Sequence, residues 1–157
     1  MRAFVLASTE TPPALTDLPM PEPGPGELRV KIRACGLNFA DLLMAKGTYQ
    51  DIPPMPFVMG MELSGTVDAL GTGVTGFTPG QKVAVFAGQG GLAEYGCFPV
   101  ERCLPLPEAM PFDQAAGFMV AYGTSHLALT HRARLKAGET LLVLGAAGGV
   151  GLTAVEI

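Results

Sequence analysis

Charged side chains are scarce in this sequence. Aspartate, glutamate, lysine and arginine make up 15% of the residues, whereas hydrophobic residues make up 48%. A typical soluble domain carries about a quarter charged residues, so we expect another domain or subunit to cover part of this surface. The net charge of -4 provides no basic surplus. This balance argues against nucleic acid and anionic membranes as partners.

Long hydrophobic runs and cysteine pairs are also missing. Glycines interrupt the uncharged stretch near the end of the chain, which is too short to span a bilayer. The first residues alternate briefly and then become acidic and proline-rich, unlike a signal peptide. Cys35, Cys97 and Cys103 form no Cys-x-x-Cys pair, which predicts reduced, mostly buried thiols. We therefore expect a cytoplasmic protein that does not associate with membranes.

Short segments with strand character fill the first hundred residues. Apolar and charged residues alternate over residues 27–34, which predicts a strand with one face in a core and one in water. Further strands are expected within residues 57–70, at 82–86 and within 93–100, separated by glycine and proline turns. Between the first two segments, Asn38 is the expected N-cap of a short helix that Gly47 ends. This pattern predicts a small, curled, mainly β domain.

Glycines dominate the last part of the sequence, after helical spacing over residues 113–120 and 122–131. Residues 141–144 are a short uncharged run of the kind found in buried parallel strands, and Gly145, Gly148 and Gly151 follow at intervals of three. Against the dinucleotide pattern G-x-G-x-x-G, Ala146 takes the first glycine position. Small residues there let the backbone turn sharply and approach a pyrophosphate at a helix start. A tight loop without a ligand is the alternative interpretation.

The motifs at residues 34–41, 47–49, 56–65, 122–124 and 138–151 together resemble the zinc-independent quinone oxidoreductase branch of the medium-chain dehydrogenase/reductase superfamily. This resemblance implies a mainly β GroES-like catalytic domain over residues 1–120. Helices and the first strand, turn and helix of a truncated Rossmann α/β domain would follow over residues 121–157. NADPH and substrate would bind in the cleft between the domains, and the full-length parent would be a homodimer. The chain ends before the residue that selects NADP or NAD, so we expect it to be a fragment.

The resemblance also identifies site residues. It places Asn38, Met61 and residues 116–120 where zinc-containing relatives hold their catalytic metal, and none of these residues offers a thiolate or an imidazole. We therefore expect no metal. Glu62 is interpreted as structural, with a hydrogen-bond or ion-pair partner, and His126 and His131 as surface or satisfied core residues.

Two residues are the expected catalytic side chains, Asn38 and Tyr49, and both are also expected to contact the cofactor. Asn38 would be at once a helix cap and a polar contact near the nicotinamide or substrate. Tyr49 would pack its ring, contact NADPH or donate a proton. The expected pyrophosphate turn consists of Ala147, Gly148, Gly149 and Val150, whereas Cys35 is interpreted as a buried small hydrophobe.

The resemblance implies that the full-length parent is an NADPH-dependent oxidoreductase that passes hydride to quinones or similar conjugated carbonyls. Quinones and enones are reactive enough to need no Lewis acid, in contrast to ordinary ketones. An enoyl-thioester or enone reductase is one alternative, and a non-catalytic NADPH-binding relative is another. The fragment alone is expected to be inactive because most of the coenzyme domain is missing.

Overall fold

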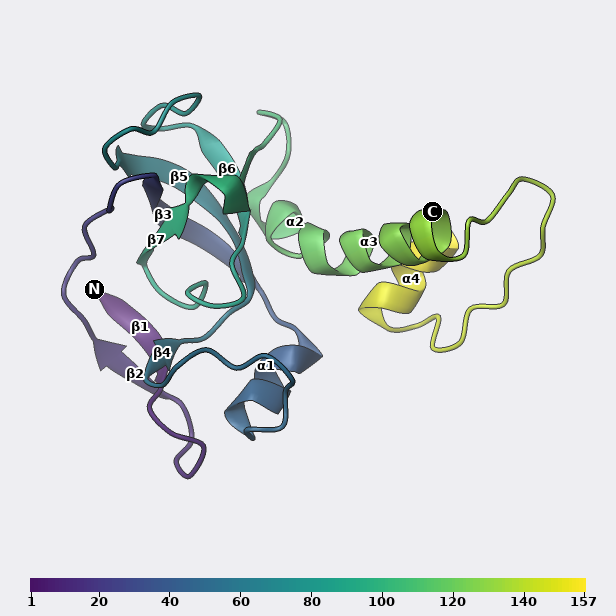
Figure 1. The fold of residues 1–157 in the computed structure, drawn as a ribbon, viewed down its shortest axis with the longest axis horizontal. Helices are drawn as coiled ribbons and strands as arrows, with labels where there is room; N and C mark the ends of the chain where they lie inside the picture. Colours follow the sequence, from purple (N-terminus) through teal and green to yellow (C-terminus); the bar gives the residue numbers. More distant parts are fainter. The chain divides into compact units, whose positions relative to one another are not determined.

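A computed structural model describes residues 1–157, which divide into two compact units, Met1–Gly117 and Phe118–Ile157 (Figure 1). The first unit contains all eight strands, and the second contains no strand. The strands are β1 (Arg2–Leu6), β2 (Ala14–Asp17), β3 (Glu27–Gly36), β4 (Phe57–Val58), β5 (Glu62–Leu70), β6 (Lys82–Phe86), β7 (Tyr95–Pro99) and β8 (Cys103–Pro105).

The strands form two antiparallel sheets. The larger sheet has five strands in the order β7-β3-β5-β6-β8, and the smaller has three in the order β2-β1-β4. The expected mainly β domain is therefore confirmed. β6 has the predicted bounds and β3 continues two residues beyond its prediction, whereas β8 was not predicted.

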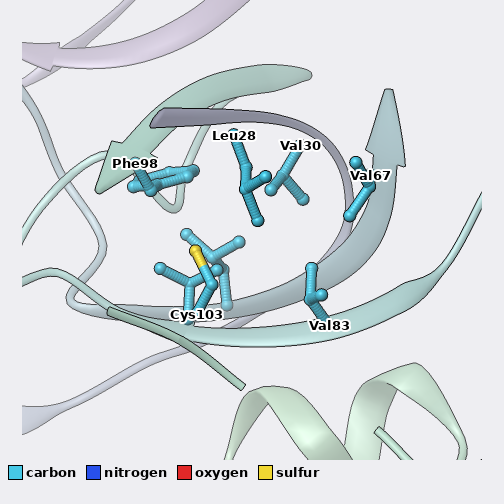
Figure 2. Close-up of a cluster of buried hydrophobic side chains, with 8 residues drawn as sticks. Leu28, Val30, Val67, Val83, Phe98 and Cys103 are labelled. Atoms are coloured by element: carbon cyan, nitrogen blue, oxygen red, sulfur yellow. The ribbon is translucent and has the colours of Figure 1, made fainter. Parts of the chain in front are cut away.

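The main core lies on the inner face of the five-stranded sheet (Figure 2). Leu28 and Val30 of β3 are fully buried, as the alternation predicts. Ile32 is only partly buried, and the register of β3 against β5 shifts between Ile32 and Ala34. A bulge of this kind bends the strand and redirects the side chains after it. The buried residues of this core are Leu28, Val30, Leu63, Val67, Val83, Val85, Phe98 and Cys103.

A second, methionine-rich core connects β1 with the first helix, α1 (Phe39–Ala45). Its buried residues are Leu6, Met44, Phe57, Met59 and Met61, and Tyr49 packs against it from the edge. Asn38 is the N-cap of α1 with extended backbone, and Gly47 follows the helix with a φ of 70°. The predicted start and end of this helix are therefore confirmed. The unit also contains a 3-10 turn, η1 (Val100–Arg102), and α2 (Phe112–Ala116).

The second unit consists of α3 (Phe118–His126), the π-helical segment η2 (Leu127–Arg132) and α4 (Gly149–Glu156). A buried hydroxyl pair joins α3 to α4, because Ser125 Oγ lies 2.8 Å from Thr153 Oγ1. Both hydroxyl groups also lie within hydrogen-bond distance of the carbonyl of Val150. His126 and His131 are exposed, which is the first of the two alternatives that the sequence left open, surface or satisfied core residues.

One predicted element is wrong in this structure. Residues 141–144, expected to form a buried parallel strand, have no strand conformation, and Leu142 and Leu144 are 80% and 83% exposed. A strand needs a neighbour to accept and donate its backbone hydrogen bonds, and the second unit contains no other strand. The turn and the helix that follow are formed. None of the helices has both the length and the apolar character needed to cross a membrane.

Candidate functional site

A hydrogen bond between Asn38 and Glu62 lies at the end of the central strand pair. Gly36, the last residue of β3, pairs with Glu62, the first residue of β5. Two residues later, Asn38 Nδ2 donates to Glu62 Oε1 at 3.0 Å. Glu62 is 3% exposed, so the amide supplies a donor that a buried carboxylate needs. A Cβ at position 36 would lie 2.7 Å from Glu62 Oε1, which explains why a glycine occupies this position.

A second buried carboxyl group lies in the first turn of α1. The backbone N–H of Asn38 donates to Asp41 Oδ2 at 2.8 Å, whereas Asp41 Oδ1 has no hydrogen-bond partner. Burial raises the pKa of Asp41, and the nearby N–H groups of Asn38 and Gly60 lower it without offsetting the burial. Asn38 is therefore fixed twice, through its backbone by Asp41 and through its side chain by Glu62.

The thiol of Cys35 lies close to two glycines beside these carboxyl groups. A Cβ on either Gly60 or Gly91 would lie 2.7 Å from Cys35 Sγ. Burial raises the pKa of Cys35 to about 12, and the charges of Asp41 and Glu62 act in the same direction. A thiol with this pKa is protonated at neutral pH, so it is neither a nucleophile nor a metal ligand in this state. Cys35 is half-buried, so its interpretation as a buried small hydrophobe holds only in part.

Tyr49 lines a cavity of about 360 Å³ in the first unit. Met61 and Phe86 provide apolar wall area, and Gln50 and Gln89 provide polar groups. Asn38 does not line this cavity. The structure thus brings Tyr49 and Met61 together and leaves Asn38 outside the cavity, bonded to the residue next to Met61.

The described residues contain no group of three or more histidine, cysteine, aspartate or glutamate side chains that is placed to hold a metal ion. At two of the three expected metal positions stand the amide of Asn38, which is hydrogen-bonded to Glu62, and the thioether of Met61. These groups are poor ligands for zinc, which prefers thiolate, imidazole and carboxylate. Residues 116–120, at the third position, contain no cysteine, histidine, aspartate or glutamate.

The predicted pyrophosphate residues lie at the start of α4. Gly148 is the N-cap of this helix, and its N–H donates to the carbonyl of Gly145 at 3.0 Å. Gly145 has a φ of 69°, and a Cβ on Gly151 would lie 2.2 Å from its carbonyl oxygen. Ala147, Gly148, Gly149 and Val150 are exposed, and a Cβ at Gly149 would meet no atom within 4 Å. The turn therefore presents open backbone at a helix N-terminus, which suits an anion.

Sequence reasoning missed two polar features of the described chain. The Ser125–Thr153 pair has no local signature because its members lie 28 residues apart. Arg102 borders the Tyr49 cavity from η1, and only the tertiary fold brings these two residues together. The single available signal was a cation next to the predicted strand 93–100.

Known proteins resemble this chain over most of its length. A sequence model of the alcohol dehydrogenase GroES-like domain matches residues 24–108. The quinone oxidoreductase-like protein 2 homolog of Nematostella vectensis is 42% identical over 135 residues, which cover 85% of this chain and 37% of the relative. The synaptic vesicle membrane protein VAT-1 homolog of Homo sapiens is 43% identical over 137 residues, which cover 87% of this chain and 35% of the relative.

Solved structures share the fold over nearly the whole chain. The human synaptic vesicle membrane protein VAT-1 homolog-like protein matches with a TM-score of 0.93 and 40% identity, covering 99% of this chain and 51% of that one. The quinone oxidoreductase of Thermus thermophilus, which was also solved in complex with NADPH, matches with a TM-score of 0.87 and 41% identity, covering 99% and 49%. The chain thus spans about half the length of these solved relatives.

The environment of Cys35 predicts slow alkylation. At pH 8, iodoacetamide should modify Cys35 in the folded protein more than about tenfold more slowly than in urea, because few thiolates form when the pKa is raised to about 12. Peptide mass spectrometry over time measures the rate at each cysteine. Cys103, with its pKa also raised to about 12, is the internal reference. Equal rates at Cys35 in the folded and unfolded protein would contradict this description of the site.

Proposed function

The chain belongs to the alcohol dehydrogenase GroES-like domain family of the medium-chain dehydrogenase/reductase superfamily, and from this premise we propose that it is the substrate-binding part of an NADPH-dependent reductase. The substrates are quinones or similar conjugated carbonyls, and the hydride is transferred without a metal ion. The quinone oxidoreductase-like relatives and the NADPH complex of one of them support this proposal. The reaction is proposed for the whole protein, with a complete coenzyme domain.

The Asn38–Glu62 hydrogen bond carries the metal-free part of the proposal. The sequence resemblance aligns Asn38 and Met61 with zinc ligands of other superfamily members. Here the amide of Asn38 donates to a buried carboxylate, the thioether of Met61 takes the second position, and residues 116–120 offer no thiolate or imidazole at the third. Without a Lewis acid, the site favours electrophiles that accept hydride readily, which describes quinones and enones better than simple ketones.

The open turn at the start of α4 fits the pyrophosphate of a dinucleotide. Its N–H groups have no acceptor within the helix, and the helix dipole favours an anion there. Gly151 allows the close approach of α4 to Gly145, as the third glycine of the dinucleotide pattern does. When bound, NADPH supplies the hydride, and the protein supplies binding and orientation.

The side chains of the first unit then orient the carbonyl substrate. Tyr49 lines a cavity with Met61 and Phe86, so its hydroxyl is available to an oxygen that gains negative charge during reduction. Glu62 holds one Nδ2–H of Asn38, which fixes the amide plane and leaves its second N–H for a ligand. A preorganised donor costs no reorganisation when charge develops.

The reaction is tested by comparing substrate classes in the whole protein. NADPH oxidation with 9,10-phenanthrenequinone should be at least about a hundredfold more efficient, in kcat/KM, than reduction of a simple ketone, because a difference of about 3 kcal/mol in activation free energy is modest for loss of Lewis-acid assistance. The absorbance of NADPH at about 340 nm follows both reactions. Equal turnover of quinones and simple ketones or alcohols would overturn the proposal.

An enone reductase is the second candidate function, and the position of Tyr49 in its cavity favours it. A proton donor is needed when a C=C bond of an enone is reduced, whereas a quinone is reduced to an oxyanion that solvent protonates. For a quinone reductase, Tyr49→Phe should therefore lower kcat/KM for quinone reduction less than it lowers kcat/KM for enone reduction. The quinone loses only a hydrogen bond to its oxygen, whereas loss of general acid catalysis typically costs about 10²–10⁴-fold.

Steady-state kinetics of Tyr49→Phe with both substrate classes provide this measurement. Tyr122→Phe is the matched control because Tyr122 lies in the second unit and lines neither the Tyr49 cavity nor the larger cavity beside it. Loss of most enone reduction in Tyr49→Phe, in a protein that prefers enones over quinones, would replace the quinone reductase proposal by the enone reductase.

A further inference from the structure

Two cavities of the first unit share part of their walls. The Tyr49 cavity adjoins a larger one of about 760 Å³, and three residues line both of them, Ala87, Gln89 and Arg102. The segment between these cavities contains Gly88 and Gly90, both with positive φ. A Cβ on Gly90 would lie 2.9 Å from the ring of Phe98. A Cβ on Gly88 would meet no atom within 4 Å. The two cavities therefore adjoin along Ala87, Gln89 and Arg102.

Arg102 is the unpaired guanidinium among these walls. Arg2 is held by Glu94, and Arg29 by Asp68 and Glu22. Arg102, at the end of η1, is exposed, and its guanidinium forms neither an ion pair nor a hydrogen bond in the structure. A guanidinium offers several N–H donors in a planar fork, which matches carboxylate, sulfonate and phosphate oxygens.

The other charged groups around the two cavities are Asp51, Glu27 and the amino group of Met1. The Met1 amino group donates to the carbonyl of Leu18 at 2.7 Å, and Glu27 accepts from the N–H of Gly24 at 2.9 Å. Asp51 is exposed and shares the smaller cavity with Arg102. For an anion in that cavity, Arg102 is attractive and Asp51 is repulsive, which gives two variants with opposite expected effects.

The walls of the two cavities differ in polarity. Tyr49, Gln50 and Gln89 provide polar groups in the smaller cavity. The larger one has mainly apolar walls, which include Leu18, Pro19, Pro21, Val58, Phe98 and Pro99. A ligand with a polar, charged end and an apolar ring system would therefore match both cavities at once.

We propose that Arg102 is a specificity-determining residue that binds an anionic substituent on the carbonyl substrate, while the apolar part of the substrate occupies the larger cavity. The substrate class, a quinone-like compound, rests on the function proposed above. The role of Arg102 concerns binding and does not depend on turnover.

The test compares two ligands of similar shape and different charge. Anthraquinone-2-sulfonate and 2-(hydroxymethyl)anthraquinone are titrated into the protein, and isothermal calorimetry gives both Kd values. Arg102→Gln should weaken sulfonate binding about three- to fivefold, as expected for an exposed ion pair, and change binding of the neutral ligand by less than about twofold. Asp51→Asn should strengthen sulfonate binding, and high salt should reduce both effects.

Arg33→Gln is the matched control, because Arg33 is an exposed arginine of the same unit that lines neither cavity. The proposal is overturned if Arg102→Gln weakens both ligands equally, if it weakens neither, or if the wild-type protein binds neither ligand. If Arg102→Gln weakens only sulfonate binding but the protein does not reduce quinones, the role of Arg102 is supported and the proposed function is wrong. If the protein reduces quinones but Arg102→Gln does not distinguish the two ligands, only the proposed role of Arg102 is wrong.

Discussion

The antiparallel pairing of β3 with β5 is the constraint on which the site depends. Its register places Gly36 opposite Glu62 and Cys35 opposite Leu63. The carboxylate of Glu62, at the start of β5, is therefore buried beside the point where β3 ends. A one-residue slip would turn every side chain of the shifted strand to the opposite face. Leu63 and Ser64, both fully buried, would then no longer point into the interior, and Glu62 would no longer reach Asn38 at the start of α1.

A buried carboxylate in turn demands a donor, and the chain provides it where α1 begins. Asn38 is the N-cap of this helix and also the donor to Glu62. One residue therefore both starts α1 and donates a hydrogen bond to the buried carboxylate of Glu62. An unpaired carboxylate at this depth would cost several kcal/mol, of the order found for buried ions. The absence of a Cβ at Gly36 gives the carboxylate its space. The residues that shape the β3–α1 connection, Gly36 and Asn38, thus also create the environment of the Glu62 carboxylate.

Periodicity and turn residues predict much of this fold. Apolar and charged residues alternate in β3, β6 carries β-branched valines, and α1 begins at an asparagine N-cap. β8 was missed since Cys103–Pro105 is short and contains proline, which is typical of a break. Residues 141–144 resemble a strand but lack a neighbour, and propensity cannot replace hydrogen-bond partners. The Asn38–Glu62 contact spans 24 residues, and the cavity shared by Tyr49 and Arg102 joins distant segments. Such contacts depend on register and sheet curvature, which residue patterns do not encode locally.

Metal-free hydride transfer is the central claim of this account, and metal content measured together with activity tests it most directly. The whole protein would be purified from cells grown with added zinc, and inductively coupled plasma mass spectrometry would give zinc per chain beside the NADPH-dependent quinone reductase rate. We predict activity with well below one zinc per chain, unchanged by treatment with a chelator. One zinc per chain, with activity that is lost on chelation and restored by zinc, would contradict the account.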